Sequence, residues 1–94
     1  MLDITRGSND EVVLAGRFDA AQVDKAKTFF SGINEGTTID FASLDYISSA
    51  GLGILLATQK RLSDRGTGLR LVNVNRHIRD VFHFSGFDQI FEIV

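Results

Sequence analysis

The stretch YISSAGLGILL (residues 46–56) places two serines and two glycines where an apolar strand gives way to an apolar helix. Gly51 and Gly53 fall in the first turn of that helix, although a glycine inside a helix costs about 1 kcal/mol relative to alanine. The stretch therefore predicts a strand-to-helix turn whose glycines serve something other than helix stability.

Short apolar runs alternate with longer helical patterns on both sides of this turn, and glycine separates them because the chain has no proline. Polar residues suited to capping precede the helical patterns, namely Asp19, the Ser48–Ser49 pair and Asn75. The pattern predicts strands at 2–5, 11–18, 37–44, 68–74 and 90–94, and helices at 19–33, 48–66 and 75–86. The element order is β-β-α-β-α-β-α-β.

Alternating strands and helices with short connections imply right-handed crossovers. The expected fold is therefore a single α/β domain over residues 1–94, with a mostly parallel sheet and an antiparallel N-terminal strand. Strand-to-helix turns of such a sheet lie at its carboxyl edge, where ligands and partners generally bind. Three turns should meet there: Asp19, residues 45–49 and residues 73–75.

Composition excludes several function classes. The 94 residues are 44% hydrophobic and carry a formal charge of −2, so the net charge gives no global attraction to nucleic acid or to anionic lipid, and we expect no nucleic-acid partner. The chain lacks cysteine, a signal-peptide pattern and any apolar stretch long enough to cross a bilayer. We expect a cytoplasmic protein without membrane insertion.

The serine turn has a structural interpretation and a functional one. A serine before an apolar helical run commonly caps the helix, which requires no further function. Bare amides at a helix N-terminus also favour an oxyanion, and glycines leave the approach open. Because the stretch lacks a P-loop or dinucleotide fingerprint, a phosphorylated serine or a docking surface is the better functional interpretation.

Other chemistry is not supported. His77 and His83 are six residues apart and lack metal-ligand spacing, and Ile47 stands where a nucleophile elbow needs its first glycine. Asp19 is expected to cap a helix, while Asp40 and Asp45 are expected to be solvated at a strand end. We predict no enzymatic activity, no metal and no cofactor.

The segment from Thr37 to Val74, with VVLAGRFDAAQ before it and FSGFDQIFEIV after it, resembles the STAS domain of bacterial anti-sigma factor antagonists. The family's common motif is Asp-Ser-Ser/Thr-Gly-Leu, in which the serine after the aspartate is phosphorylated. By position that serine is Ser49, with Ser48 as the alternative. This chain has Ser48 in place of the aspartate and Ala50 in place of the second hydroxyl.

The resemblance implies a partner switch. The unphosphorylated form would bind an anti-sigma factor, often a serine kinase, and so release the sigma factor; phosphorylation would end the binding, and a serine phosphatase would restore it. The implied partner-binding residues lie around the turn and at the matching aspartate: Asp19, Ser48, Ser49, Ala50, Gly51, Leu52 and Gly53.

Two alternatives stay open. The first is a docking or scaffold subunit of a signalling or lipid-transport complex that does not switch, and the second is a nucleotide-binding STAS domain that uses the Gly-Leu-Gly turn.

The chain stops at IFEIV, where the family's domains continue into a final helix. A strand with Ile90, Phe91, Ile93 and Val94 carries apolar groups on both faces, so we expect an apolar patch there. This patch predicts self-association away from the serine edge.

Overall fold

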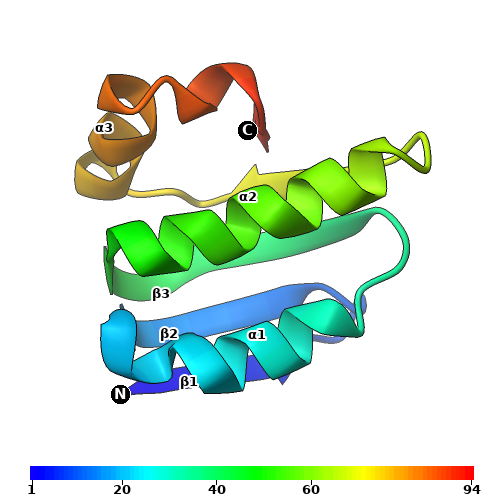
Figure 1. Cartoon of the computed structure of the whole chain (residues 1–94). Helices are drawn as coiled ribbons and strands as arrows, with labels where there is room; N and C mark the ends of the chain where they lie inside the picture. Colours follow the sequence, from blue (N-terminus) through cyan, green and yellow to red (C-terminus); the bar gives the residue numbers. More distant parts are fainter.

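The computed structural model describes all residues from Met1 to Val94 as one sheet covered by helices (Figure 1). The sheet has the strand order β1-β2-β3-β4-β5, with β1 antiparallel to β2 and the remaining pairs parallel. The elements are β1 (Leu2–Arg6), β2 (Val12–Phe18), a 3-10 turn η1 (Ala20–Gln22), α1 (Val23–Ser31), β3 (Thr37–Ile47), α2 (Ser49–Ser63), β4 (Leu69–Val72), α3 (Arg76–Phe84), a 3-10 turn η2 (Phe87–Gln89) and β5 (Glu92–Ile93). The predicted fold class and element order are confirmed.

The core lies on one face of the sheet. Along β2, Val12, Leu14 and Phe18 are buried, while the intervening Val13 is half-buried and Arg17 is exposed. Figure 1 shows α1 and α2 lying side by side over the sheet, and α2 supplies Leu52, Leu55 and Leu62 to the core. The alternating buried side chains of the strands and the regularly spaced leucines of α2 pack against each other in this single layer.

Strand β3 is longer than predicted, because it continues through residues 45–47 to Ile47. Its register against β2 slips twice, between Val13 and Ala15 and again between Gly16 and Arg17, with the extra residues on β3. Each bulge adds one residue, so the buried side chains of β3 follow a spacing of two, then three, then three: Ile39, Phe41, Leu44 and Ile47.

The carboxylate of Asp40 holds the first bulge. Its Oδ1 accepts from the backbone N–H of Ala42 at 2.9 Å and from Nδ2 of Asn73 at 3.0 Å. Asp40 therefore joins the bulge to the loop after β4, and the expectation that it is merely solvated at a strand end is wrong. Asp45 is exposed, although it too lies within β3.

The first predicted helix is divided. Oδ1 of Asp19 accepts from the N–H of Ala21 at 3.2 Å, so this residue caps the 3-10 turn η1 rather than α1 itself. The end of the chain also differs from the prediction, because residues 87–89 form η2 and only Glu92 and Ile93 pair with β4.

The C-terminal segment buries part of the expected apolar patch. Phe91 is only 5% exposed, and its ring lies 5.4 Å from the ring of Phe82 on α3 in an edge-to-face arrangement. Ile93 is half-buried, whereas Ile90 is 44% and Val94 56% exposed. The exposed apolar surface at this end is therefore smaller than the alternating pattern suggested.

Candidate functional site

The serine turn lies where the ends of β2 and β3 meet the start of α2. The backbone N–H of Ser48 donates to the carbonyl oxygen of Phe18 at 2.8 Å, so the turns after these two strands are directly joined. Asp19 follows Phe18 and therefore lies at the same edge. Two of the three predicted turns meet as expected.

The third turn lies farther back along the sheet. Strand β4 pairs with β3 only as far as Val72 opposite Asp40, while β3 continues for seven more residues. Nδ2 of Asn75 donates to the carbonyl oxygen of Leu44 at 3.3 Å. Residues 73–75 thus run beside the middle of β3 rather than beside the serines.

The two serines have different roles in the turn. Ser48 has extended backbone, and its Oγ accepts from the N–H of Gly51 at 3.2 Å, which is the geometry of an N-cap. Ser49 is the first helical residue and is exposed. Its hydroxyl makes no hydrogen bond within the chain, so it is the free hydroxyl of the pair.

Gly51 is required by packing. It is buried, and a Cβ atom placed on it would lie 2.9 Å from Cδ1 of Phe18 and 3.0 Å from Cγ1 of Ile47. The missing side chain lets α2 begin in close contact with the ends of β2 and β3. Leu52 is also buried, at 5% exposure.

Gly53 differs from Gly51, because a Cβ atom on it would meet nothing within 4 Å and the residue is exposed. Of the seven predicted partner-binding residues, Gly51 and Leu52 therefore lie beneath the surface. Of the other five, Ser49 and Gly53 are exposed, and Asp19, Ser48 and Ala50 are half-buried. Because the Gly-Leu-Gly stretch lies inside α2, it forms no open loop that cradles a phosphate, which weakens the nucleotide alternative.

Sequence reasoning missed a groove that begins beside this turn. It has a volume of about 390 Å³ and lies between α1 and α2, with Ala50, Gly53 and Ala57 along one wall. We name it the α1–α2 groove. The spacing of three and four residues between these small side chains was the only sign of the groove in the sequence. The facing wall comes from α1, and no local sequence pattern shows that α1 packs beside α2.

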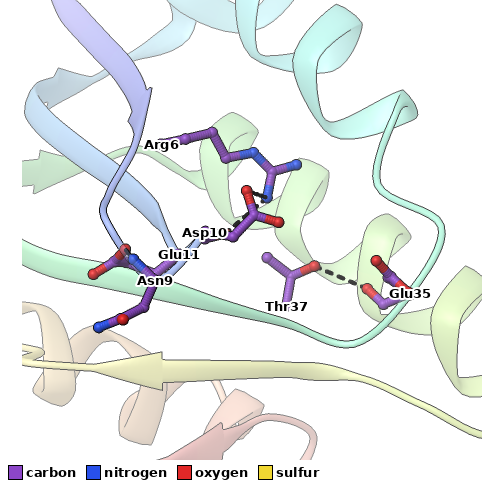
Figure 2. Close-up of polar contacts among 6 residues, drawn as sticks. All are labelled: Arg6, Asn9, Asp10, Glu11, Glu35 and Thr37. Carbon is purple, nitrogen blue, oxygen red and sulfur yellow. Dashed lines mark hydrogen bonds and ion pairs between the residues drawn. The ribbon is translucent and has the colours of Figure 1, made fainter.

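A second hollow is polar and lies at the opposite end of the strands, between the β1–β2 hairpin and the loop before β3 (Figure 2). Two of its charged side chains, Arg6 and Glu11, bond to backbone groups of the hairpin. Arg6 donates to the carbonyl oxygen of Asp10 at 2.9 Å, and Oε1 of Glu11 accepts from the N–H of Asn9 at 3.1 Å. These contacts fix the hairpin.

The chain holds no group of three or more histidine, aspartate or glutamate side chains arranged to bind a metal ion. None of its helices is long and apolar enough to cross a bilayer.

Comparisons with known proteins agree with this geometry. A family model described as "Mlab, STAS domain" matches residues 3–94. BtrV of Bordetella bronchiseptica, described as a proposed anti-sigma factor antagonist, is 40% identical over 74 residues, which cover 79% of this chain and 58% of BtrV. This chain therefore spans just over half the length of that relative.

Solved structures share the fold at low sequence identity. An anti-sigma factor antagonist from Mycobacterium paratuberculosis aligns over 99% of this chain and 83% of its own, with a TM-score of 0.81 and 21% identity. The Bacillus cell fate determinant SpoIIAA in its phosphorylated form aligns over 100% of this chain and 91% of its own, with a TM-score of 0.71 and 22% identity.

Proposed function

The chain belongs to the STAS domain family, and from this membership we propose that it is an anti-sigma factor antagonist that acts by binding rather than by catalysis. Its unphosphorylated form binds an anti-sigma factor in the bacterial cytoplasm and thereby frees a sigma factor. Phosphorylation of Ser49 ends the binding, and a serine phosphatase reverses it. The relative BtrV supports the class of function, and the name of the phosphorylated SpoIIAA structure supports the type of switch.

One observation carries the assignment of Ser49. The hydroxyl of Ser48 already accepts the hydrogen bond that caps α2, whereas the hydroxyl of Ser49 is exposed and makes none. A kinase therefore reaches Ser49 without breaking the cap.

The physics of a phosphate at this position suits a switch. A phosphoserine adds about −1.5 to −2 charges, and the positive end of α2 accommodates negative charge, so the fold survives. The cost falls on a partner docked against Ala50 and Gly53, because a hydrated dianion must be desolvated or excluded there. Disrupting a buried polar pair at an interface costs about 2 to 5 kcal/mol, and each 1.4 kcal/mol is tenfold in affinity.

The test uses anti-sigma factors encoded by the source organism. Each is purified and titrated against the unphosphorylated chain by calorimetry, and those with kinase activity are then incubated with the chain and ATP. We expect one of them to bind, to place phosphate on Ser49 in peptide mapping, and to lose affinity for the product. Phosphate confined to Ser48 would overturn the site, and the absence of any binding anti-sigma factor would overturn the function.

A second candidate is a docking subunit of a signalling or lipid-transport complex that does not switch. The specific observation in its favour is that Ser48 stands in place of the motif's aspartate and Ala50 in place of its second hydroxyl, so the chain departs from the phosphorylated motif. This candidate predicts that the chain isolated from the source cell co-purifies in a fixed complex and carries no phosphate on Ser49 under any growth condition.

A further inference from the structure

The α1–α2 groove starts at the serine turn and follows α2. Its wall on α2 extends from Ala50 to Arg61, which is about 16 Å at 1.5 Å per residue. The facing wall on α1 includes Val23, Lys27 and Phe30. Figure 1 shows that the two helices run alongside each other, and the residues lining the groove come from both of them.

Small side chains line the α2 wall of the groove, so the backbone of a partner helix can approach it. Ala50, Gly53 and Ala57 lie three and four residues apart, so no large side chain rises from this strip of α2. Half-buried Ile54 and the rim of Phe30 provide apolar contact beneath it. Small residues at such spacing let another backbone approach closely, and an amphipathic helix recognises a groove through anchors at i, i+4 and i+7.

The charge of the groove is positive, although the whole chain carries −2. Its ten lining residues include Lys27 and Arg61 but no aspartate or glutamate. Arg61 closes the end of α1, because its guanidinium donates to the carbonyl oxygens of Ile33 at 2.6 Å and Phe30 at 2.8 Å. Lys27 is exposed and takes part in none of the chain's three ion pairs, so its ammonium is free for a partner's carboxylate.

Resting on the proposed function, we propose that the α1–α2 groove binds an amphipathic helix of the anti-sigma factor, about three turns long. Aliphatic anchors of this helix lie over Gly53 and Ala57, and one of its carboxylates pairs with Lys27. The end of the helix nearest Ala50 meets Ser49, so a phosphate there repels the flanking acidic residues and blocks the start of the groove.

A second copy of the chain does not have this chemistry. Its exposed large apolar side chains are Met1, Phe84, Ile90 and Val94, which lie at the chain ends and at the last residue of α3. None of them forms a row of anchors on a helix with acidic neighbours. A partner protein is therefore the occupant that the groove fits.

The experiment takes an anti-sigma factor that binds in the calorimetric titrations proposed above and measures its affinity for four variants of the unphosphorylated chain. Lys27→Glu reverses the charge of the groove, and Ala57→Leu fills it. Lys60→Glu makes the same charge change on the other flank of α2, and Thr28→Leu adds apolar bulk on α1 outside the groove. Circular dichroism and urea unfolding check that each variant folds.

We expect Lys27→Glu and Ala57→Leu to weaken binding at least tenfold, while Lys60→Glu and Thr28→Leu stay within threefold of the parent. A photo-crosslinker placed at Ser31, an exposed residue that lines the groove, should label a helical segment of the anti-sigma factor that contains aspartate or glutamate.

Each other outcome overturns the proposal. If the anti-sigma factor binds all five proteins equally, the groove is not its site, although the proposed function stands. Equal losses in Lys27→Glu and Lys60→Glu indicate non-specific electrostatics, and equal losses in Ala57→Leu and Thr28→Leu indicate a general effect of added apolar bulk. Crosslinking to a second copy of the chain identifies a self-interface instead. If no anti-sigma factor binds the parent, the proposed function fails and the groove proposal fails with it.

Discussion

Ser48 and Ser49 are adjacent at the start of α2, but their hydroxyl groups have different roles. The Ser48 hydroxyl is committed to the N–H of Gly51, and the Ser49 hydroxyl is exposed. Substitutions at the two positions should therefore have opposite effects on stability and binding.

We predict that Ser49→Asp leaves the melting temperature within a few degrees of the parent, because a carboxylate is favourable at a helix N-terminus. Its affinity for the anti-sigma factor should fall at least tenfold. Ser48→Ala should instead lower stability and leave the affinity unchanged. Loss of the cap lowers the free energy of unfolding by about 1 kcal/mol, which lowers the melting temperature by about 4 to 8 °C in a domain of this size. Thermal unfolding and calorimetry measure both. Unfolding of the chain by Ser49→Asp would show that Ser49 is structural.

Gly51 and Gly53 form a second matched pair. Gly51→Ala places a Cβ atom 2.9 Å from the buried ring of Phe18, so we expect overpacking to outweigh the gain in helix propensity and to lower the free energy of unfolding by about 1 kcal/mol. Gly53→Ala adds a methyl group to open space and should raise the free energy of unfolding by about 0.5 to 1 kcal/mol. Urea unfolding measures both changes. Equal shifts in the two variants would contradict the packing explanation of Gly51.

At the scale of elements, the long strand β3 depends on its two bulges. They keep Phe41, Leu44 and Ile47 on the covered face even though these residues are three apart in sequence. Without the extra residues, strict alternation would turn Leu44 to the open face of the sheet. The carboxylate of Asp40 accepts two hydrogen bonds at the first of these bulges.

We predict that Asp40→Ala lowers the free energy of unfolding by about 1 to 2 kcal/mol, because it removes the acceptor for Ala42 and Asn73. Asp45→Ala is the matched control on the same strand. Its side chain is exposed and makes no hydrogen bond, so the change should stay within about 0.5 kcal/mol. If chemical denaturation gives the two variants the same stability, Asp40 does not hold the bulge.

Helix α3 holds the C-terminal segment through a polar contact as well as through Phe91. Nδ1 of His83 lies 2.9 Å from Oδ2 of Asp88, and this hydrogen bond lowers the pKa of Asp88 below its ordinary value of 3.8 against the opposing effect of partial burial. Because the pKa is lower in the folded chain than in the unfolded one, ionised Asp88 stabilises the fold above the unfolded value. That contribution is lost as the pH falls through the folded value.

We therefore expect the Asp88 carboxyl to titrate at a lower pH in the parent than in His83→Ala, as followed by NMR between about pH 2 and 6. Above pH 5 the carboxyl is ionised in both proteins. Identical titration curves would show that the contact with His83 is absent in solution.

At the scale of the whole molecule, the helices cover one face of the sheet and the sheet has two edges. The edge at β1 is partly closed, because the N–H of Leu2 donates to Oε1 of Gln22 at 3.3 Å and its carbonyl oxygen accepts from the ammonium of Lys25. The other edge, at β5, is only two residues long, and Ile90 and Val94 beside it are exposed.

We predict weak self-association through the C-terminal surface of Ile90 and Val94, away from Ser49. Ile90→Asp should abolish it without unfolding the monomer, since this side chain is already 44% exposed. Phe91→Ser is unsuitable as a probe, because Phe91 is buried against Phe82 and its loss destabilises the chain. Sedimentation over a hundredfold concentration range provides the measurement. A strictly monomeric parent that binds no hydrophobic dye would contradict this prediction.

The amino-acid sequence by itself determined the order of elements and the positions where α2 and α3 begin. Asp19, Ser48 and Asn75 each cap a 3-10 or α-helix as their residue types predicted. These features depend on contacts within one turn of the chain, so a local pattern contains all the information they need. The serine motif is local in the same sense, which is why Ser49 could be proposed before the fold was known.

Only the tertiary structure decided which parts of the turn are accessible. Gly51 is buried because Phe18, 33 positions earlier, lies against it, whereas Gly53 two residues later faces an open groove. The bulges of β3, the burial of Phe91 and the wall that Lys27 adds to the groove likewise depend on partners distant in sequence. Packing between elements is set by the shapes of both surfaces at once, and the sequence of either element alone describes only one of them.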